Sequence, residues 1–568
     1  MMRHERGARL LLAHRMTTAR IPASPQNGIM APLRLPVFRR IWIASLLSNF
    51  GFMTLSVGAA WTMTLLTATA EMVALVQTSL MLPMMLLSMI AGALADMYNR
   101  RKVGLAALAG SLLSAACLAA LTLAGLTTPW SLLGFCFLIG AGMALFNPSW
   151  QASVGEQVPA ADLPQAIALN SISFNIARSF GPALGGMIVA TAGNMTAFTV
   201  TTLFYLPLFI VLLLWRRDKI PARLPPERID RAVGAGVRYA VHSQPIRIVL
   251  IRTTAIGIGG GCVSALMPLI ARDLIGGQAQ TFGIMLGAFG VGSVLGALAL
   301  PRIRRLFSNE KIVTLSSLGM ALCVMAIAQS HSLALSVLAL LGAGAGWMIA
   351  LTVFNMVVQM SVPRWVTGRA LAAYQSAIAG GIAVGSWLWG KVAEAENVSI
   401  ALLVAAGLLA LSVGLKIIWP IPDVDDSDKN TIELKDPDVN LAVSGRSGPV
   451  VVEIEYQVDM EDAREFYDRM LKVKAGRLRT GAFGWSLSRD MEDPRLWLER
   501  YQYATWNDYL RQRSRSTPQE RQDHGDAKIY HRGPPDLKVR RFLERPFGSV
   551  RWKEDAPDPH LGPLPPSA

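Results

Sequence analysis

Charged residues are scarce in this chain of 568 residues. Only 16% of them are Asp, Glu, Lys or Arg, against about a quarter in a soluble globular protein, and 52% are hydrophobic. The four cysteines all lie in apolar stretches, so the sequence has neither a disulfide framework nor the paired spacing of a zinc site. These shortages exclude a soluble enzyme of this length, a disordered chain and a small secreted domain. A protein that crosses a membrane many times remains.

Acidic side chains are missing from the middle of the long apolar runs. A helix needs roughly 20 apolar residues to cross the hydrocarbon core of a membrane. Twelve runs meet this length: 40–66, 72–95, 103–124, 129–150, 165–191, 195–215, 246–271, 281–300, 311–329, 333–358, 367–391 and 398–419. Six runs, a basic connector and six more runs predict two equal halves, the arrangement of a transporter that rocks around a site at mid-membrane.

Basic residues are unevenly placed. Residues 1–419 contain 30 Lys and Arg against 12 Asp and Glu. They gather before the first run and after the second, sixth and eighth runs, so the positive-inside rule predicts a cell (inner) membrane protein with both termini in the cytoplasm. Because these residues alternate with apolar runs and do not form one polar face, we expect no nucleic-acid partner.

The composition divides the chain into successive regions. They are a basic extension (1–37, with Met16 or Met30 as an alternative start), a transmembrane half (38–216), a connector with an amphipathic cytoplasmic helix (217–245), a second transmembrane half (246–419), an acidic linker (420–447), a cytoplasmic domain (448–545) and a Pro-rich tail expected to be disordered (546–568). The predicted fold class is an all-α polytopic membrane protein of twelve transmembrane helices with a small C-terminal α+β domain.

The C-terminal region has its own pattern. Apolar and polar residues alternate at 450–458, which predicts a half-exposed strand, and Asp459 is placed to cap the helix that follows. Further strands are expected at 483–489, 495–503 and 538–544, with helical stretches at 505–528. This β-α-β-β-α-β order predicts a ferredoxin-like unit.

One loop carries a family signature. After the second run the sequence reads Gly92-Ala-Leu-Ala-Asp96-Met-Tyr-Asn99-Arg100-Arg101-Lys102, which resembles the G-x-x-x-D-x-x-G-R-R/K motif of the major facilitator superfamily. Asn99 replaces a glycine there, and asparagine tolerates a left-handed turn. Asp96 and Arg100, four residues apart, can pair across one helical turn, and the carboxylate can also bind the N-terminus of a neighbouring helix. The predicted conformational gate is Gly92, Asp96, Arg100, Arg101 and Lys102; the alternative is a plain basic anchor. The second half has a degenerate copy of this motif, called the echo below, with Gly292, Gly296, Arg302, Arg304 and Arg305 but no Asp.

Further stretches narrow the resemblance. Residues 36–42, 48–51, 147–152 and 168–186 are similar to the transmembrane secretion effector branch of this superfamily, and the resemblance covers about residues 32–545. It implies a facilitator fold, export by alternating access and coupling to protons, although the spans contain no mid-membrane carboxylate to carry one. Gly181, Pro182, Gly185 and Gly186 resemble the kink of antiporters in the superfamily, with a simple packing kink as the alternative.

A single arginine stands within the fifth run. Arg178 lies about 13 residues from its start, near mid-membrane at 1.5 Å per residue, and a charge at that depth is a functional candidate. It is predicted either to bind an anionic or catecholate-like group of a substrate, or to be a structural residue held by helix carbonyls or Asn175. Side chains predicted either to line the same cavity or to bond between helices are Asn49, Gln77, Asn147, Asn170, Asn175, Asn355, Gln359 and Gln375.

The C-terminal domain resembles dimeric α+β barrel domains, some of which are small monooxygenases or haem degraders. His524 and His531, with Trp485, Trp497 and Trp506, could suggest a site there, but no pair of metal ligands on one helix face is evident. We interpret the domain as a dimerisation or regulatory module and expect no enzyme activity, metal or cofactor.

Together these patterns predict an exporter of small amphipathic molecules, such as siderophores, drugs or a secondary metabolite. Its expected partners are a small-molecule substrate, the lipid bilayer, protons as the coupling ion, and a second copy of the chain bound through the C-terminal domain. The alternatives are a membrane-tethered oxidoreductase, a sensor or scaffold that transports nothing, and an importer. The glycine runs lack the Lys and Ser/Thr of a phosphate-binding loop, so an ATP-driven pump is not expected.

Overall fold

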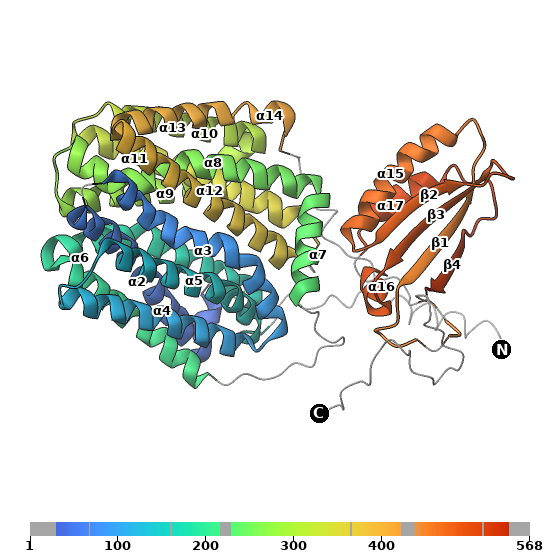
Figure 1. Cartoon of the computed structure of the whole chain (residues 1–568), viewed down its shortest axis with the longest axis horizontal. Helices are drawn as coiled ribbons and strands as arrows, with labels where there is room; N and C mark the ends of the chain where they lie inside the picture. The colour runs from blue at the N-terminus through green and yellow to red at the C-terminus, as the bar shows by residue number, and fades with distance from the viewer. Residues whose placement is uncertain are drawn as a thin grey trace, which may run out of the picture.

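The computed structural model describes residues 30–544, except 68, 160–161, 216–228, 364–365, 422–436, 438, 442 and 514–515. The predicted Pro-rich tail, most of the acidic linker and most of the N-terminal extension lie outside these residues. Figure 1 shows a body of long helices and, beside it, a smaller domain built on a sheet, with α7 lying between the two.

The first half of the helical body consists of α2 (Pro36–Leu66), α3 (Ala70–Met97), α4 (Arg100–Leu123), α5 (Pro129–Ser153) and α6 (Leu163–Leu214). Local rules fix where these helices begin. Pro36 and Pro129 occupy first-turn positions, where a backbone N–H has no helical partner, and Thr128 and Ser131 form a capping box before α5. The long α6 is interrupted at Gly193, whose φ of 81° is easily reached only by glycine.

The second half follows the connector helix α7 (Ile229–His242). It consists of α8 (Gln244–Leu269), α9 (Ala279–Leu306), α10 (Asn309–Ala328), α11 (Leu333–Met360), α12 (Thr367–Ala395), α13 (Val398–Ser412) and the short α14 (Leu415–Ile418). A π-helical turn, Ile270–Leu274, extends α8. These bounds agree with the predicted apolar runs to within a few residues.

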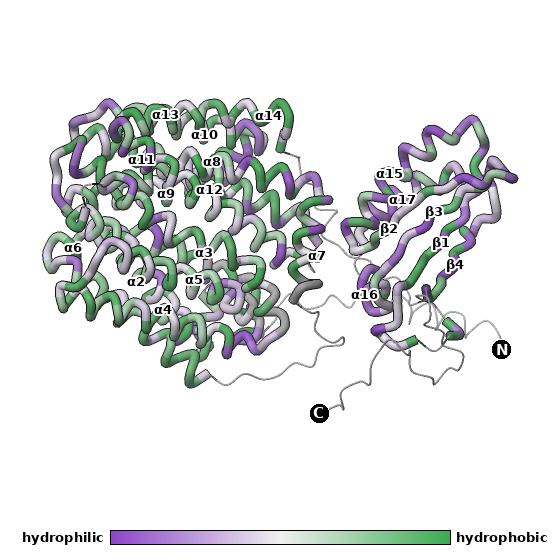
Figure 2. Tube along the Cα trace, in the orientation of Figure 1, coloured by the Kyte–Doolittle hydropathy of each residue, from purple (hydrophilic) through white to green (hydrophobic). Residues whose placement is uncertain are grey.

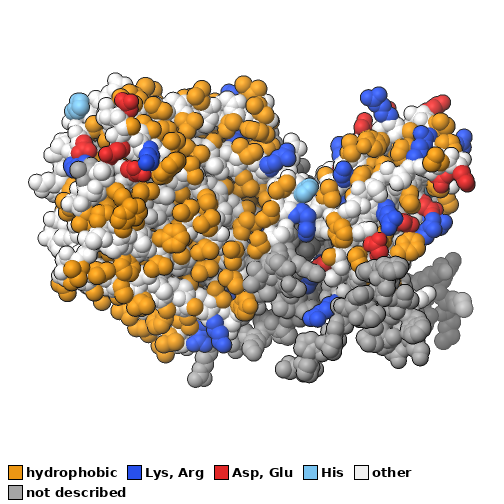
Figure 3. Space-filling view, in the orientation of Figure 1, with side chains coloured by type: hydrophobic (Ala, Val, Ile, Leu, Met, Phe, Trp, Pro, Cys, Tyr) orange, Lys and Arg blue, Asp and Glu red, His pale blue; other side chains and the backbone are white. Residues whose placement is uncertain are grey.

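Ten helices in the part of the chain that the structure describes are long and apolar enough to cross a membrane. The fifth of these covers both apolar runs of α6, and α12, which is rich in glycine and alanine, is not among them. Figure 2 shows apolar residues along the helices of the body. In Figure 3 hydrophobic side chains are spread over its visible face, whereas charged side chains are frequent on the smaller domain. The protein is therefore a polytopic membrane protein.

The two halves meet along two helix pairs, α3 with α12 and α6 with α9. Small residues bring these helices together. A Cβ at Gly283 of α9 would lie 2.9 Å from the Cα of Gly186, and a Cβ at Gly390 of α12 would lie 2.6 Å from the Cβ of Ala74. Such small-residue contacts are the usual means of helix association in lipid. We call the α3–α12 contact the seam.

The helical body has two ends, which the positions of the helix termini distinguish. The α7 end carries the α3–α4 turn, the start of α12 and the residues after α14. The far end carries the α2–α3 turn, the π-helical turn and the α12–α13 turn. α7 itself contacts α3, α8 and α12.

The smaller domain contains β1 (Val450–Gln457), α15 (Ala463–Arg479), β2 (Phe483–Arg489), β3 (Leu496–Tyr503), α16 (Trp506–Arg513), α17 (Pro518–Lys528) and β4 (Lys538–Leu543). The described strands form one antiparallel sheet in the order β2-β3-β1-β4. α15 and α17 lie over one face of this sheet (Figure 1). Alternate residues of β1 point into the core, among them Val452, Ile454 and Tyr456.

The predicted cap of the first helix in this domain is wrong. α15 begins at Ala463, four residues after Asp459, and the residue before it makes no side-chain cap bond. Asp459 instead pairs with Arg532, at 3.3 Å from Oδ2 to Nε. A turn at 460–462 therefore separates the strand from the helix, which the apolar spacing alone did not reveal.

Candidate functional site

Arg178 projects from α6 toward the second half of the body. Its Nη2 donates to Sδ of Met348 on α11, at 3.1 Å, and its side chain is close enough to Tyr374 on α12 for an electrostatic interaction. Tyr374 is itself anchored, since its hydroxyl donates to the carbonyl of Leu351 at 2.9 Å. A thioether is a weak acceptor. Among the described side chains no carboxylate pairs with this guanidinium.

The other predicted cavity residues are spread over several helices. Asn49, Gln77, Asn147, Asn170 and Asn355 are half-buried, whereas Gln359 and Gln375 are exposed. Gln359 donates to Asn355 one turn earlier on α11. The Oδ1 of Asn170 is buried without a hydrogen bond among the described residues. The side chain of Asn175, the alternative partner of Arg178, lies outside the described part, so a shared cavity stays a prediction.

The Gly181–Gly186 segment is a contact surface. A Cβ at Gly181 would lie 2.6 Å from the Cβ of Met53, and one at Gly185 would lie 3.0 Å from the Cα of Thr54. Gly186 meets Gly283 across the halves. The helix continues through this segment, and the break in α6 comes at Gly193. These glycines therefore let α6 pack closely against α2 and α9, and the antiporter-like kink stays a prediction.

The signature loop differs from its predicted local geometry. α3 ends at Met97 and α4 begins at Arg100, so Asp96 and Arg100 do not share a helical turn. Asn99 adopts an extended conformation, with φ −63° and ψ 108°, and not a left-handed one. Its Oδ1 accepts from the Arg101 backbone N–H at 3.1 Å, because the first N–H groups of a helix lack helical partners. The side chain of Asp96 lies outside the described part.

The arginines of the loop hold neighbouring segments. Arg101 donates from Nε to the Leu212 carbonyl at 2.9 Å and from Nη2 to the Leu213 carbonyl at 2.6 Å. These carbonyls end α6, where a cation is favoured by the helix dipole. Arg100 donates to Glu156 at 2.9 Å, Lys102 is exposed, and a Cβ at Gly92 would lie 3.9 Å from Ala372 across the seam.

An ion pair formed by a buried arginine of the second half was missed by the sequence reasoning. Arg252 of α8, 2% exposed, donates from Nη1 to both carboxylate oxygens of Glu310, at 2.8 and 2.6 Å. Glu310 also accepts from the Ile421 backbone N–H at 2.8 Å, and Arg252 lies 3.4 Å from the Trp419 carbonyl. The predicted echo, Arg302, Arg304 and Arg305, is exposed. The sequence signal that could have found the pair was an arginine inside the apolar run 246–271.

Polar contacts also join the halves at the far end. Lys391 of α12 pairs with Glu71 of α3 at 3.0 Å, and Glu394 accepts from the Ala70 backbone N–H at 2.5 Å, at the start of α3. Arg272 donates to the Thr64 carbonyl at the end of α2, at 3.3 Å. Each contact crosses from one half to the other. The sequence placed Glu71 and Glu394 near outer ends, but their partners are hundreds of positions away.

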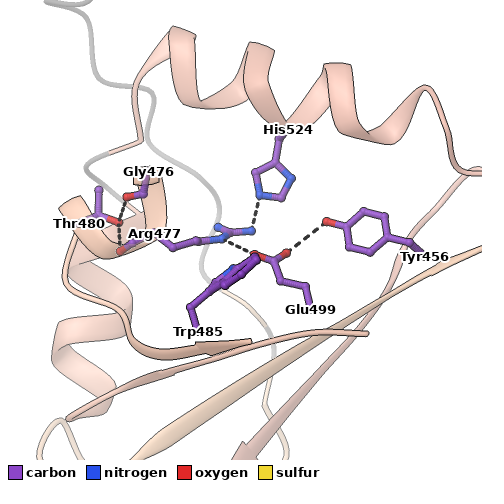
Figure 4. A network of polar contacts seen from close by, with 7 residues as sticks. All are labelled: Tyr456, Gly476, Arg477, Thr480, Trp485, Glu499 and His524. Carbon is purple, nitrogen blue, oxygen red and sulfur yellow. Dashed lines mark hydrogen bonds and ion pairs between the residues drawn. The ribbon is translucent and has the colours of Figure 1, made fainter. Parts of the chain in front are cut away.

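The smaller domain encloses a polar network between its helices and its sheet (Figure 4). Glu499 of β3 is 0% exposed and accepts from Arg477 Nε at 3.2 Å, Trp485 Nε1 at 3.1 Å and Tyr456 Oη at 3.2 Å. Arg477 also donates to His524, and its guanidinium lies 4.5 Å from the centre of the Tyr501 ring.

The charges of this network are balanced internally. Burial by itself raises the pKa of Glu499, but the charges of Arg477 and His524 and the hydrogen bonds from Arg477 and Trp485 together lower it. Burial, reinforced by Arg477, lowers the pKa of His524 to about 4, so its imidazole is neutral and can accept from the guanidinium. The polar groups of the network satisfy one another's hydrogen bonds, and a buried network that is satisfied in this way helps to specify a fold. No group of three metal-ligating side chains occurs among the residues described.

A comparison with family models gives a match over residues 27–547 to a family described as transmembrane secretion effector. The match extends through the sheet-containing domain. It therefore covers most of the chain.

Three characterised relatives are transport proteins. The staphyloferrin A transporter of Staphylococcus aureus is 27% identical over 42% of this chain, which spans 60% of that relative's length. The multidrug efflux pump Tap of Mycolicibacterium fortuitum is 26% identical over 60% of this chain and 84% of its own length. The enterobactin exporter EntS of Salmonella choleraesuis is 25% identical over 69% of this chain and 96% of its own length.

Solved structures share the fold of the helical body. A mutant of the nucleoside transporter NupG superposes with a TM-score of 0.55 at 14% identity, over 67% of this chain and 99% of that one. A bacterial homologue of the lysosomal transporter Spinster, inward-facing and occupied, has a TM-score of 0.55 at 12% identity, over 68% and 97% of the two chains. At these identities the likeness concerns the fold alone.

Proposed function

This chain belongs to the transmembrane secretion effector family of the major facilitator superfamily, and from that membership we propose that it exports small amphipathic molecules by alternating access. The named relatives act on staphyloferrin A, on multiple drugs and on enterobactin. We infer that a siderophore, a drug or a secondary metabolite is the substrate class here. Transport, and not enzyme catalysis, is the activity of the helical body.

The proposed topology has twelve spans in two halves, 38–216 and 246–419. α6 supplies two of them, separated at Gly193, and α12 supplies another although it is not among the ten helices that are apolar enough by composition. The α7 end faces the cytoplasm, because the basic clusters of the sequence lie at that end. The smaller domain, 448–545, is then a cytoplasmic ferredoxin-like unit, in keeping with its strand order.

Arg178 carries the proposal about the substrate. A guanidinium whose described contacts are a thioether and a tyrosine retains an unbalanced charge in a low-dielectric body. An anionic group on the substrate, such as a carboxylate or a catecholate, would balance that charge through the two parallel N–H groups that arginine offers. Met53 lies beside Gly181 and Met348 beside Arg178, and methionine surfaces adapt to differently shaped apolar groups.

Protons are the proposed coupling ion, by family membership. The gate residues Gly92, Asp96, Arg100, Arg101 and Lys102 are proposed to form contacts in one conformation that break in the other. The bonds of Arg100 to Glu156 and of Arg101 to the end of α6 support this role, because they connect elements that lie on different parts of the first half.

A metabolite comparison tests export. Small molecules are measured in cells and medium of a deletion strain and its parent, with and without a protonophore. We expect one compound to accumulate inside the deletion strain, and inside the parent when the gradient is collapsed. Equal compartments in all cultures, with the protein present in the membrane, would contradict export.

A matched pair of variants tests the site. Arg178→Met keeps the length and apolar character of the side chain but removes its charge, and Arg302→Met makes the same change at an exposed position of α9. We expect Arg178→Met to abolish efflux of the identified compound while the control transports normally. Unchanged efflux by Arg178→Met, at equal membrane abundance, would remove the substrate role of this residue.

The open face of the sheet bears on the predicted homodimer. It carries cross-strand ion pairs, Arg500 with Glu453 at 3.9 Å and Lys538 with Glu455 at 3.1 Å. A pairing of two copies through this face would be polar. Dimerisation through this domain stays a proposal, and the mass of the detergent-solubilised protein by light scattering tests it.

A further inference from the structure

The connector helix α7 rests on both halves of the transporter at once. It contacts α3 of the first half and α12 of the second, at the α7 end of the seam. Tyr239 and Ala240, 4% and 8% exposed, form its buried face together with Gly236. Nothing in the transport proposal requires a helix at this position, because a flexible chain could link the two halves.

Gly236 lets α7 approach the seam closely. A Cβ at this position would lie 3.2 Å from the Cβ of Arg369 on α12 and 3.4 Å from Cε of Met89 on α3. One residue therefore contacts both sides of the seam. Gly234, half a turn away on the same helix, would meet nothing within 4 Å. The close packing belongs to one face of α7 and not to the whole helix.

The other side of α7 contacts the C-terminal domain. α15 packs against α7, and the turn after α15 brings Gly481 to the side chain of Arg238, where a Cβ would lie 3.4 Å from Nη2. Gly481 has a φ of 111°, which other residues reach only with strain. We call this turn, Thr480 and Gly481, the docking turn. Its glycine allows a backbone shape that other residues would adopt only with strain.

The docking turn is continuous with the buried network of the domain. Thr480, directly before Gly481, donates to the carbonyls of Gly476 and Arg477, at 3.0 and 3.2 Å. Arg477 is the cation that binds Glu499 and His524 (Figure 4). A change in the packing of this domain would consequently reach the turn that contacts α7.

We propose that α7 is a clamp, a helix that holds α3 and α12 together across the seam. We further propose that the C-terminal domain regulates this clamp by docking its Gly481 turn on Arg238. The proposal rests on alternating access as the proposed function. When the halves separate at this end, Met89 and Arg369 move apart, and α7 can follow only one of them. A contact present in one state and absent from the other stabilises the first, so docking favours the state in which α7 spans the seam.

The seam can be probed without knowing the substrate. Ala372 of α12 is 7% exposed and faces Gly92 across the seam, so a cysteine placed there reacts with a maleimide when the helices part. The reaction is followed in membrane vesicles with the α7 end accessible. The protein without Ala372→Cys gives the background from the native cysteines, which are buried or half-buried.

The clamp is tested by one substitution at two positions of α7. We expect Gly236→Leu to raise labelling of Ala372→Cys several-fold, because the new side chain cannot fit between Met89 and Arg369. Gly234→Leu should label like the parent, since it makes the same change where space is open. Gly236→Ala serves if the larger variant fails to reach the membrane. Equal labelling at both positions would overturn the clamp.

The control by the C-terminal domain needs its own variant. Arg238→Ala leaves the face of α7 that meets the seam unchanged but removes the side chain under Gly481. We expect it to raise labelling, and to change the rate of efflux in the same preparation. Parental labelling in Arg238→Ala, with raised labelling in Gly236→Leu, would overturn regulation by the domain. Labelling does not depend on transport, so a chain that exports nothing can still confirm or refute the clamp.

Discussion

The two halves of the transporter close their α7 ends by bonds of opposite polarity. In the first half, Arg101 at the start of α4 donates to the carbonyls of Leu212 and Leu213 at the end of α6. In the second half, Glu310 at the start of α10 accepts from the N–H of Ile421, just beyond α14. Corresponding helices are thus bonded in the two halves: the start of α4 to the end of α6, and the start of α10 to the residues after α14. A cation makes the bond in the first half and an anion makes it in the second. We call each of these bonds a tie.

The difference lies in what happens when each tie is broken. Arg101 is half-buried, so water can accept the hydrogen bonds of its guanidinium when the carbonyls of Leu212 and Leu213 no longer do. Glu310 holds Arg252, whose side chain is 3% exposed and would remain as a buried, unpaired charge. Unpaired buried charges are costly, whereas exposed ones are rehydrated. We therefore propose that the first half releases its tie during transport and that the second half keeps its tie.

The largest effect is expected from Glu310→Ala. Removing one partner of a fully buried pair costs about 3–5 kcal/mol. The cost here approaches that range because the side chain of Arg252 is 3% exposed, and it stays at the lower end because that of Glu310 is 23% exposed. We expect a large loss of folded protein in the membrane and a lower melting temperature in detergent. Glu396→Ala, at an exposed position near the end of α12, is the matched control. A Glu310→Ala protein as stable as its parent would show that the second tie is not structural.

A smaller and different effect is expected from Arg101→Ala. Hydrogen bonds to a charged group contribute about 1.5–3 kcal/mol each to a folded state, and here that state is one conformation of a cycle. Efflux should fall while membrane abundance stays near that of the parent. Lys416→Ala, at an exposed position of α14 outside the gate, controls for the loss of a basic residue. Loss of abundance in Arg101→Ala would place both ties in the same structural class.

Asp96→Asn tests the only acidic residue of the proposed gate. Removing the negative charge while keeping the shape should lower transport and leave abundance intact, because the proposed contact of Asp96 belongs to one conformation only. Efflux per molecule in vesicles is the measurement, with Asp162→Asn outside the signature as the comparison. Unchanged efflux would remove Asp96 from the gate and leave Arg100, Arg101 and Lys102 as its charged residues.

Sequence reasoning placed the elements well, because hydrophobic period and local capping determine them. The run 129–150 became α5, Pro129–Ser153, and the strand expected at 483–489 is β2, Phe483–Arg489. The order of strands and helices in the smaller domain also followed from alternation. α12 is the weak case, since its glycines serve close packing and lower its apolarity below that of a typical span.

The pairs across helices could not be predicted in the same way. Arg252 and Glu310 are 58 positions apart, and nothing in either local pattern indicates the other. The echo of the signature pointed to Arg302 and its neighbours, which are exposed, because the sequence shows charge but not which helix end it approaches. Asn99 likewise looked like a turn residue, but the start of α4 provides an N–H for it to cap.

The smallest effect is expected from the pair of Glu71 and Lys391 at the far end, which gives the comparison an exposed reference. Their side chains are 28% and 51% exposed, and such pairs contribute about 0.2–1 kcal/mol. We expect Lys391→Glu to reduce efflux modestly, since it places two carboxylates side by side at a contact between the halves. The double variant Glu71→Lys with Lys391→Glu should restore the parental rate, because it reverses the pair and keeps its attraction. If efflux by the double variant stayed below the parental rate, each residue would act through a partner other than the one seen here. The far-end pair would then not be an exposed reference, and its loss would have to be compared with that of the Glu310 tie.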